Sequence, residues 1–113
     1  GLAFEQRDAG NYQGDYNLFH IAPNARMIAV GYEDEFTLKD IKSGSWTKYS
    51  GQDSHFVVVH KISEIFADPA SFDLHLLKTS PAKDSGTSAG APDVDYNGNS
   101  RPQGSGYDIG AYE

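Results

Sequence analysis

The stretch that decides the fold is residues 72–113, which read FDLHLLKTSPAKDSGTSAGAPDVDYNGNSRPQGSGYDIGAYE. Its middle part, residues 79–106, is rich in Pro, Gly, Ser and Asp and has almost no large aliphatic residue. By composition alone such a stretch is typical of a disordered linker, because it buries too little surface to offset the entropy lost on ordering. The motifs inside it indicate a folded segment instead.

Four motifs carry this interpretation. The first alternates apolar and polar residues and predicts a half-buried strand. The last is an apolar cluster that predicts an edge strand with its large residues turned inward. In chain order the motifs are Phe72-Asp73-Leu74-His75-Leu76, Ser80-Pro81-Ala82-Lys83-Asp84-Ser85-Gly86, Asp93-Val94-Asp95-Tyr96-Asn97-Gly98-Asn99-Ser100-Arg101-Pro102 and Tyr107-Asp108-Ile109-Gly110-Ala111-Tyr112-Glu113.

Together the motifs resemble the C-terminal ending of many secreted bacterial right-handed parallel β-helix proteins, which are pectate-lyase-like. In that family the patterns D-F-H-L, S-P-A-I-D-A-G, D-x-D-G-x-x-R-P and D-I-G-A-Y-E follow in the same order. This chain has Lys83 where an aliphatic residue is usual, Ser85 where Ala is usual, and Tyr96-Asn97-Gly98 in place of a shorter D-G turn. These changes are compatible with a surface position.

The resemblance extends more weakly upstream and so covers roughly the whole chain. Three segments are similar to a last-coil strand, to the stretch after it and to a connecting turn. They are Gly14-Asp15-Tyr16-Asn17-Leu18-Phe19, Gly51-Gln52-Asp53-Ser54-His55 and Phe66-Ala67-Asp68-Pro69. We therefore expect a mainly β fold, either the terminal coil and cap of a right-handed parallel β-helix or a small autonomous β-rich domain with at most one short helix.

The chain has 113 residues, so we expect a single domain in which residues 1–71 form the last coil and a hairpin and residues 72–113 form the cap. Local patterns predict the elements of the first part. The first is a strand ending at Phe19, and the second is a hairpin in which residues 26–32 and a return strand with Phe36 and Leu38 flank the acidic turn 33–35. A short helix follows, capped by Thr37 and Asp40 and stopped at residues 43–45. The last is a central strand buried on both faces, Phe56-Val57-Val58-Val59.

A β-helix is built from stacked coils of roughly 20–30 residues that cover one another. This chain has room for one coil at most, and its opening Gly1-Leu2 without Met favours a fragment. The resemblance implies an extracellular or cell-surface protein in which this segment is a non-catalytic capping or accessory module, with upstream coils as its partner. In the family the active groove lies on the central coils, so we expect no catalytic residue here, although the parent would be a polysaccharide lyase or glycoside hydrolase.

Two other functions remain as alternatives. One is an autonomous carbohydrate-binding or surface-adhesion domain, for which Tyr32, Trp46, Tyr49 and His55 are the candidate residues, because aromatic faces stack on flat ligands. The competing interpretation places the single tryptophan in the core. The less favoured alternative is a small lyase or hydrolase in its own right.

The segment from Asp93 through Asp95 and Asn97 to Gly98 matches the first half of a calcium loop. Position twelve is Gly104 rather than Glu, which favours an Asp/Asn-rich turn whose side chains bond the backbone. Calcium binding and such a turn are therefore both kept as expectations. No other cofactor is predicted.

The four histidines lack the spacing of a zinc site, and His55 follows Asp53 closely enough to form an acid–base pair, although a satisfied histidine at a strand entry is favoured. No nucleophile elbow, phosphate loop or dinucleotide fingerprint is present.

The formal charge is −7 and the nine basic residues are scattered, which disfavours nucleic acid as a partner. Neutral or cation-bridged glycans are the better partners for such a surface. The chain has no cysteine and no apolar run of about 20 residues, so neither a disulfide nor a membrane span is expected. An open strand edge would allow a homodimer.

Overall fold

The computed structural model describes residues 2–4, 11–20, 26–31 and 34–113. In this part the chain forms three small sheets, two short α-helices and two 3-10 turns, so the predicted β-rich character is confirmed. The expectation of at most one short helix is wrong. The elements are β1 (Leu2–Phe4), β2 (Asn17–His20), β3 (Arg26–Val30), β4 (Asp34–Thr37), α1 (Leu38–Lys42), α2 (Ser45–Ser50), β5 (Phe56–Val59), η2 (Ile62–Glu64), β6 (Phe66–Asp68), η3 (Pro69–Ser71) and β7 (Asp73–Leu76).

The sheets combine parallel and antiparallel pairs. The first has the order β1-β3-β4, in which β1 and β3 run parallel and β3 and β4 antiparallel. The second is the parallel pair β2-β5, and the third is the antiparallel pair β6-β7. The parallel pairs join strands far apart in the sequence, so the chain must cross over between them.

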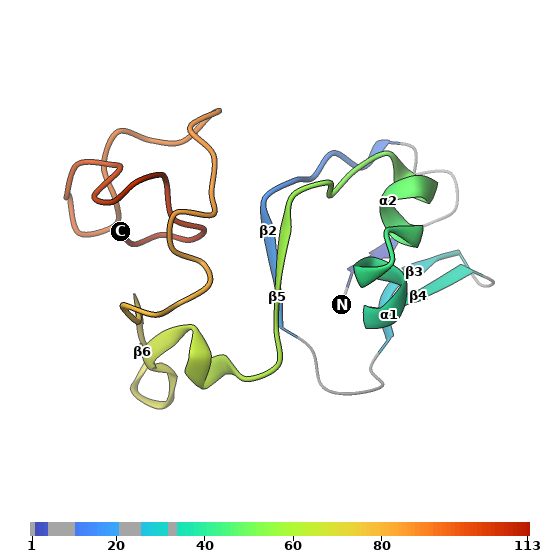
Figure 1. Ribbon diagram of the computed structural model, residues 1–113, viewed down its shortest axis with the longest axis horizontal. Coiled ribbons are helices and arrows are strands. Elements are labelled where there is room, and N and C mark those ends of the chain that lie inside the picture. Colours follow the sequence, from blue (N-terminus) through green and yellow to red (C-terminus); the bar gives the residue numbers. More distant parts are fainter. Residues whose placement is uncertain (1, 5–10, 21–25, 32–33) are drawn as a thin grey trace.

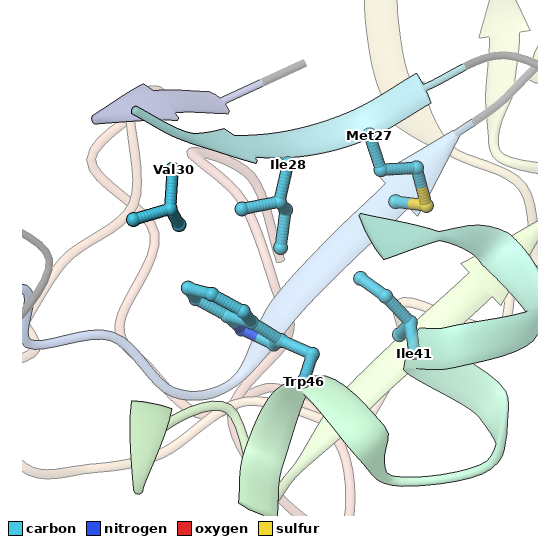
Figure 2. Packing of buried hydrophobic residues seen from close by; sticks show 5 residues of the cluster. All are labelled: Met27, Ile28, Val30, Ile41 and Trp46. Carbon is cyan, nitrogen blue, oxygen red and sulfur yellow. The ribbon is translucent and has the colours of Figure 1, made fainter. Parts of the chain in front are cut away.

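The predicted hairpin is confirmed, but its return strand starts at Asp34, inside the expected acidic turn. The ladder has an irregularity between Arg26 and Ile28. A bulge of this kind interrupts the strict alternation of side chains, and the neighbouring Met27 and Ile28 are both buried. Figure 2 shows both side chains directed from β3 toward Trp46 and Ile41.

Helix α1 has the capping box predicted from Thr37 and Asp40: the Asp40 N–H donates to Thr37 Oγ1, and Asp40 Oδ2 accepts from the Thr37 N–H at 2.8 Å. It ends at Ser43, as expected. Helix α2 was not predicted, because Trp46, Thr47 and Tyr49 are weak helix formers. Burial of Trp46 against β3 supplies the stabilisation that local propensity lacks.

The parallel pair β2-β5 lies between two hydrophobic clusters, with the helices on one side and the C-terminal segment on the other (Figure 1). Alternate residues of β5 pack on the two clusters, so both faces of this strand are covered, but of its four residues only Val59 is fully buried. Phe19, Phe56 and Val58 pack on the cluster of Met27, Ile28, Val30, Ile41 and Trp46, whereas Leu18 and Val57 pack on the cluster of Val59, Ile65 and Ala82.

The predicted strand at residues 72–76 forms as β7, but its alternation does not bury the expected face, since Phe72 is 88% exposed and Leu74 is also exposed. The predicted edge strand at Tyr107–Tyr112 is wrong. Residues 77–113, all of which are described, contain no strand beyond an isolated bridge between Val94 and Ser100. Backbone groups of residues 107–111 instead form hydrogen bonds with Ala82, Gly86 and Tyr96, which lie on separate loops.

Candidate functional site

The C-terminal segment is held by a buried ion pair. Arg101 Nε donates to Glu113 Oε1 at 2.6 Å. Arg101 Nη2 also donates to the Asp108 carbonyl oxygen at 2.9 Å, and the Gln103 N–H donates to Glu113 Oε2 at 2.9 Å. Burial raises the pKa of Glu113, but the hydrogen bonds from Gln103 and Arg101 outweigh it, so that the pKa lies below its ordinary value. Two motifs of the resemblance are thus one hydrogen-bonded unit.

A second unit forms around the buried carboxylate of Asp95. Its Oδ1 accepts from the N–H groups of Asn97 and Asn99 at 2.9 and 2.8 Å. Its Oδ2 accepts from Asn99 Nδ2 and from the Glu113 N–H at 3.0 and 3.2 Å. These hydrogen bonds lower the pKa of Asp95 although burial opposes them. This is the Asp/Asn-rich turn that competed with the calcium prediction.

The residues predicted to bind calcium do not converge on a cation. Asp95 directs both oxygens to N–H groups, and Asn97 Nδ2 lies 2.7 Å from His75 Nε2. Asp93 contributes its backbone carbonyl oxygen to the Arg101 N–H. Within the described residues no group of three His, Cys, Asp or Glu side chains is placed to hold a metal.

The second motif packs against the last one. Ile109 N–H donates to the carbonyl oxygen of Ala82, which is fully buried, and Gly86 N–H donates to the carbonyl oxygen of Tyr107. A Cβ atom on Gly86 would lie only 2.7 Å from the Asp108 carbonyl oxygen, so this close approach requires glycine. Gly86, which matches the last position of the family pattern S-P-A-I-D-A-G, is therefore required by the packing of the second motif on the last one.

The predicted sugar-binding residues do not form one surface. Trp46 is 0% exposed, so the prediction that it presents a stacking face is wrong and the core interpretation holds. Tyr49 is 48% exposed and lies against Phe36 with ring centroids 5.1 Å apart. His55 stacks on Tyr16 instead, at 4.7 Å between centroids. Tyr32 lies outside the described residues.

The buried indole N–H of Trp46 has a hydrogen-bond acceptor in a polar cluster around Asp53. Trp46 Nε1 donates to Asp53 Oδ2 at 2.8 Å, and Tyr12 OH donates to the same oxygen at 2.9 Å. Asn17 Nδ2 donates to Asp53 Oδ1 at 2.6 Å. Burial and the contact with Asp53 raise the pKa of Tyr12 to about 12. Asp53 therefore has a structural role.

His55 does not pair with Asp53; the favoured interpretation, a satisfied histidine at a strand entry, holds, and its partner is Asp15. His55 Nδ1 lies 2.8 Å from Asp15 Oδ2, and the His55 N–H donates to Asp15 Oδ1 at 2.6 Å. Burial raises the pKa of Asp15, but these bonds and that from Ser54 lower it to about 2. Because Asp15 and His55 precede β2 and β5, the pairing of those strands brings them together.

An open cavity of about 460 Å³ lies beside α1, α2 and β5, with Lys42 and Lys48 in its lining. Its hydroxyl groups are already engaged within the protein: Thr47 Oγ1 donates to the Asp53 carbonyl oxygen and Ser54 Oγ donates to Asp15 Oδ2. Lys42 Nζ is engaged as well, since it lies 3.2 Å from His60 Nε2. The cavity therefore offers few free polar contacts.

Sequence reasoning missed an aromatic group on the C-terminal segment. Tyr96 is 77% exposed, and its ring meets that of Tyr112 edge to face at 5.6 Å. The His75 ring lies 4.2 Å from that of Tyr112. The only signal in the sequence was Tyr96 in the expanded turn, where the family pattern has no aromatic residue.

No α-helix in the described residues is long and apolar enough to cross a membrane. Comparison of this chain with protein-family models, with curated proteins and with solved structures finds no significant match.

Proposed function

We propose that this chain is the non-catalytic C-terminal cap of an extracellular, polysaccharide-active parallel β-helix protein. The observation that supports this most is the order of the parallel pairs. Strands β1 and β2 follow one another along the chain, and the later strands β3 and β5 pair with them in the same order. Stacked coils of a solenoid produce this relationship, because each strand of one coil lies beside its equivalent in the next.

The spacing of the pairs is compatible with coils. Leu2 pairs with Ile28, a separation of 26 residues, which lies within the usual period of a coil. Asn17 pairs with Phe56, a separation of 39 residues, because β4, α1 and α2 are inserted before β5. On this interpretation the chain contributes strands to two successive coils, more than the single coil expected from its length.

The C-terminal segment supports the capping part of the proposal. Ala82 and Ile109 pack in the cluster that covers Val57 and Val59 of β5. This segment runs as loop (Figure 1), and most of its exposed residues are polar or glycine. A terminal unit with an apolar inner face and a polar outer face is what a solenoid needs to remain soluble.

The partner of the cap would be the preceding coil. Among the described strands, β1 pairs only with β3 and β2 only with β5. The backbone N–H and C=O groups of their other edges have no strand partner among the described residues, and a further parallel strand could pair with them. We propose that upstream coils of the same protein occupy these edges; a homodimer through them is the competing occupant.

The test begins with the reading frame upstream of Gly1, which should encode further strands with a coil-like period. The chain should then be compared with a longer product that adds about 50 residues, roughly two coils. Amide hydrogen exchange should slow at the β1 and β2 residues whose N–H groups point away from β3 and β5. A frame without such strands, or unchanged exchange in the longer product, would contradict the cap.

The proposal assigns no catalysis to these residues, since the polysaccharide-active groove would lie on the upstream coils. Two carboxylate–histidine pairs in the described residues resemble an acid–base pair. Asp15 and His55 are explained by the joining of β2 to β5. Asp73 and His75, whose side chains lie 2.6 Å apart, are two residues apart on β7. An assay of the isolated chain on pectate, alginate and chondroitin should show no depolymerisation. Turnover that is lost in His55→Ala would overturn this part of the proposal.

A further inference from the structure

The exposed aromatic side chains near the C-terminus form a group in which three rings contact one another. We define the tyrosine shelf as Tyr96, Tyr112 and His75. Tyr112 is half-buried and touches both other rings, whereas Tyr96 is largely open to solvent. Single exposed apolar side chains are common on protein surfaces, but here three rings contact one another and form a continuous group.

The shelf is rigidly mounted. Tyr96 N–H donates to the Ala111 carbonyl oxygen at 2.7 Å, which ties the loop of Tyr96 to the chain beside Tyr112. The residue before Tyr96 is bonded to the residue after Tyr112: Asp95 Oδ2 accepts from the Glu113 N–H at 3.2 Å. Tyr96 is thus held by its own N–H, and Tyr112 lies between two bonded neighbours, so a ligand that stacks on them would not have to order the loop first.

Polar groups surround the shelf. Asp73 Oδ1 lies 2.6 Å from His75 Nδ1, and Asn97 Nδ2 lies 2.7 Å from His75 Nε2. Both nitrogens of the imidazole therefore have a partner, Nδ1 in Asp73 and Nε2 in the Asn97 amide. Asn97 Oδ1 and the two tyrosine hydroxyls take no hydrogen bond from any described residue, so they are available to a ligand.

We propose that the tyrosine shelf is a binding platform for a neutral glycan. A pyranose ring has an apolar C–H face, which packs on the ring of Tyr96, and hydroxyl groups, which bond to Asn97 Oδ1 and the tyrosine hydroxyls. One exposed aromatic face, that of Tyr96, with a few polar groups beside it is the combination that such a ring requires. This site is separate from the sugar-binding residues predicted by the sequence.

Charge selects the class of glycan. Beside the shelf lies the carboxylate of Asp73, whose pKa is lowered by the hydrogen bonds from His75. The turn that carries Tyr96 also carries Asp93 and Asp95. The chain as a whole has a formal charge of −7. A uronate would meet repulsion here, whereas a neutral sugar would not. The inference does not depend on the capping role, since it needs only the geometry of this segment.

The test uses the whole chain with neutral probes, namely cello-, xylo- and manno-oligosaccharides, and with acidic probes, namely oligogalacturonate and alginate oligosaccharide. Binding is followed by calorimetry and by NMR shifts of the tyrosine rings. We expect at least one neutral probe to bind and Tyr96→Ala to weaken it about tenfold, the effect of losing one stacking face. Tyr49→Ala is the matched control, because Tyr49 is also exposed but lies on α2, and it should leave binding unchanged.

Tyr96→Phe separates stacking from hydroxyl contacts and should retain most of the affinity, whereas Asn97→Ala should weaken it. Circular dichroism and the urea midpoint of each variant verify that the fold is kept. Failure of all neutral probes, preference for the acidic probes, or equal losses in Tyr96→Ala and Tyr49→Ala would overturn the proposal. Self-association of the chain that disappears in Tyr96→Ala would also overturn it, by assigning the shelf to a second copy. None of these results alters the hydrogen-exchange test of the cap.

Discussion

Arg101 Nε and Glu113 Oε1 are joined by a hydrogen bond of 2.6 Å, and the two side chains are 7% and 0% exposed. The pair links the turn that ends in R-P to the last residue of D-I-G-A-Y-E. Arg101 Nη2 also donates to the Asp108 carbonyl oxygen, and Glu113 Oε2 accepts from the Gln103 N–H, and these added bonds offset part of the cost of burying two charges. The C-terminal segment is thus ordered by polar contacts where aliphatic residues are scarce.

Removal of one partner should therefore be costly. We expect Glu113→Ala to lower the free energy of unfolding by about 3–5 kcal/mol, because Arg101 would remain buried without its counter-ion. Urea denaturation followed by circular dichroism measures this change. Glu64→Ala is the control, since Glu64 is exposed on η2, and it should change stability by less than about 0.5 kcal/mol. Equal effects of the two substitutions would contradict the role of the pair.

Asp53→Asn tests the cluster around Trp46. The substitution keeps the shape of the side chain but places an NH2 group where a carboxylate oxygen accepts from Trp46, Tyr12 or Asn17. A buried donor facing another donor should cost about 1–3 kcal/mol of stability. Ring NMR titration should also show the pKa of Tyr12 falling from about 12 toward 10.0, since one of the causes of the rise is removed.

The control for this substitution is Asp93→Asn, because Asp93 is exposed and uses its backbone carbonyl oxygen rather than its carboxylate. Its effect on stability and on the titration of Tyr12 should be negligible. An unchanged Tyr12 titration in Asp53→Asn would show that burial alone raises that pKa.

Gly86→Ala tests the close contact between the second and fourth motifs. The new Cβ would lie 2.7 Å from the Asp108 carbonyl oxygen and 2.8 Å from that of Tyr107, both backbone atoms that cannot move independently. We expect a loss of about 1–3 kcal/mol in stability. Gly106→Ala is the matched substitution, since its nearest atom would be at 3.4 Å, and it should be tolerated in the same thermal melt.

The link between β2 and β5 should make stability depend on pH. The pKa of Asp15 is about 2 in the folded chain against an ordinary 3.8, so its ionised form stabilises the fold above 3.8. This contribution is lost as pH falls from 3.8 toward 2. The lowered pKa values of Asp40, Asp73, Asp95 and Glu113 act in the same direction.

We expect Asp15→Asn to be less stable than the wild type at neutral pH and to lose less stability across this window. Urea midpoints measured on both sides of 3.8 provide the comparison. Asp34→Asn is the control, since Asp34 is an exposed residue at the start of β4 and should leave the acid dependence unchanged. Identical acid profiles for Asp15→Asn and the wild type would show that the pair contributes nothing.

Calcium should have little effect on the turn at residues 93–98. Both oxygens of Asp95 already accept N–H bonds, so a cation would have to break them before binding. We expect no heat in a calorimetric calcium titration and no shift of the melting temperature with calcium or a chelator. A saturable heat that vanishes in Asp95→Asn would mean that the turn rearranges around the ion.

The sequence by itself determined the features that depend on short spacing. Thr37 and Asp40 cap a helix because residues three apart meet in its first turn, and the alternation in Phe56-Val57-Val58-Val59 places side chains on both faces of β5. The Asp/Asn-rich turn likewise follows from side chains that bond the backbone within four residues. Helix α2 was missed because its stability comes from burying Trp46, a distant contact.

Only the tertiary structure decided which distant groups meet. His55 pairs with Asp15 rather than with the nearby Asp53, because the register of β2 against β5 brings together residues that are 40 apart in the chain. His75 reaches Tyr112 because the ending folds back on β7 instead of forming a strand of its own. Such contacts depend on how backbone bonds and burial close long loops, for which residue spacing carries no signal.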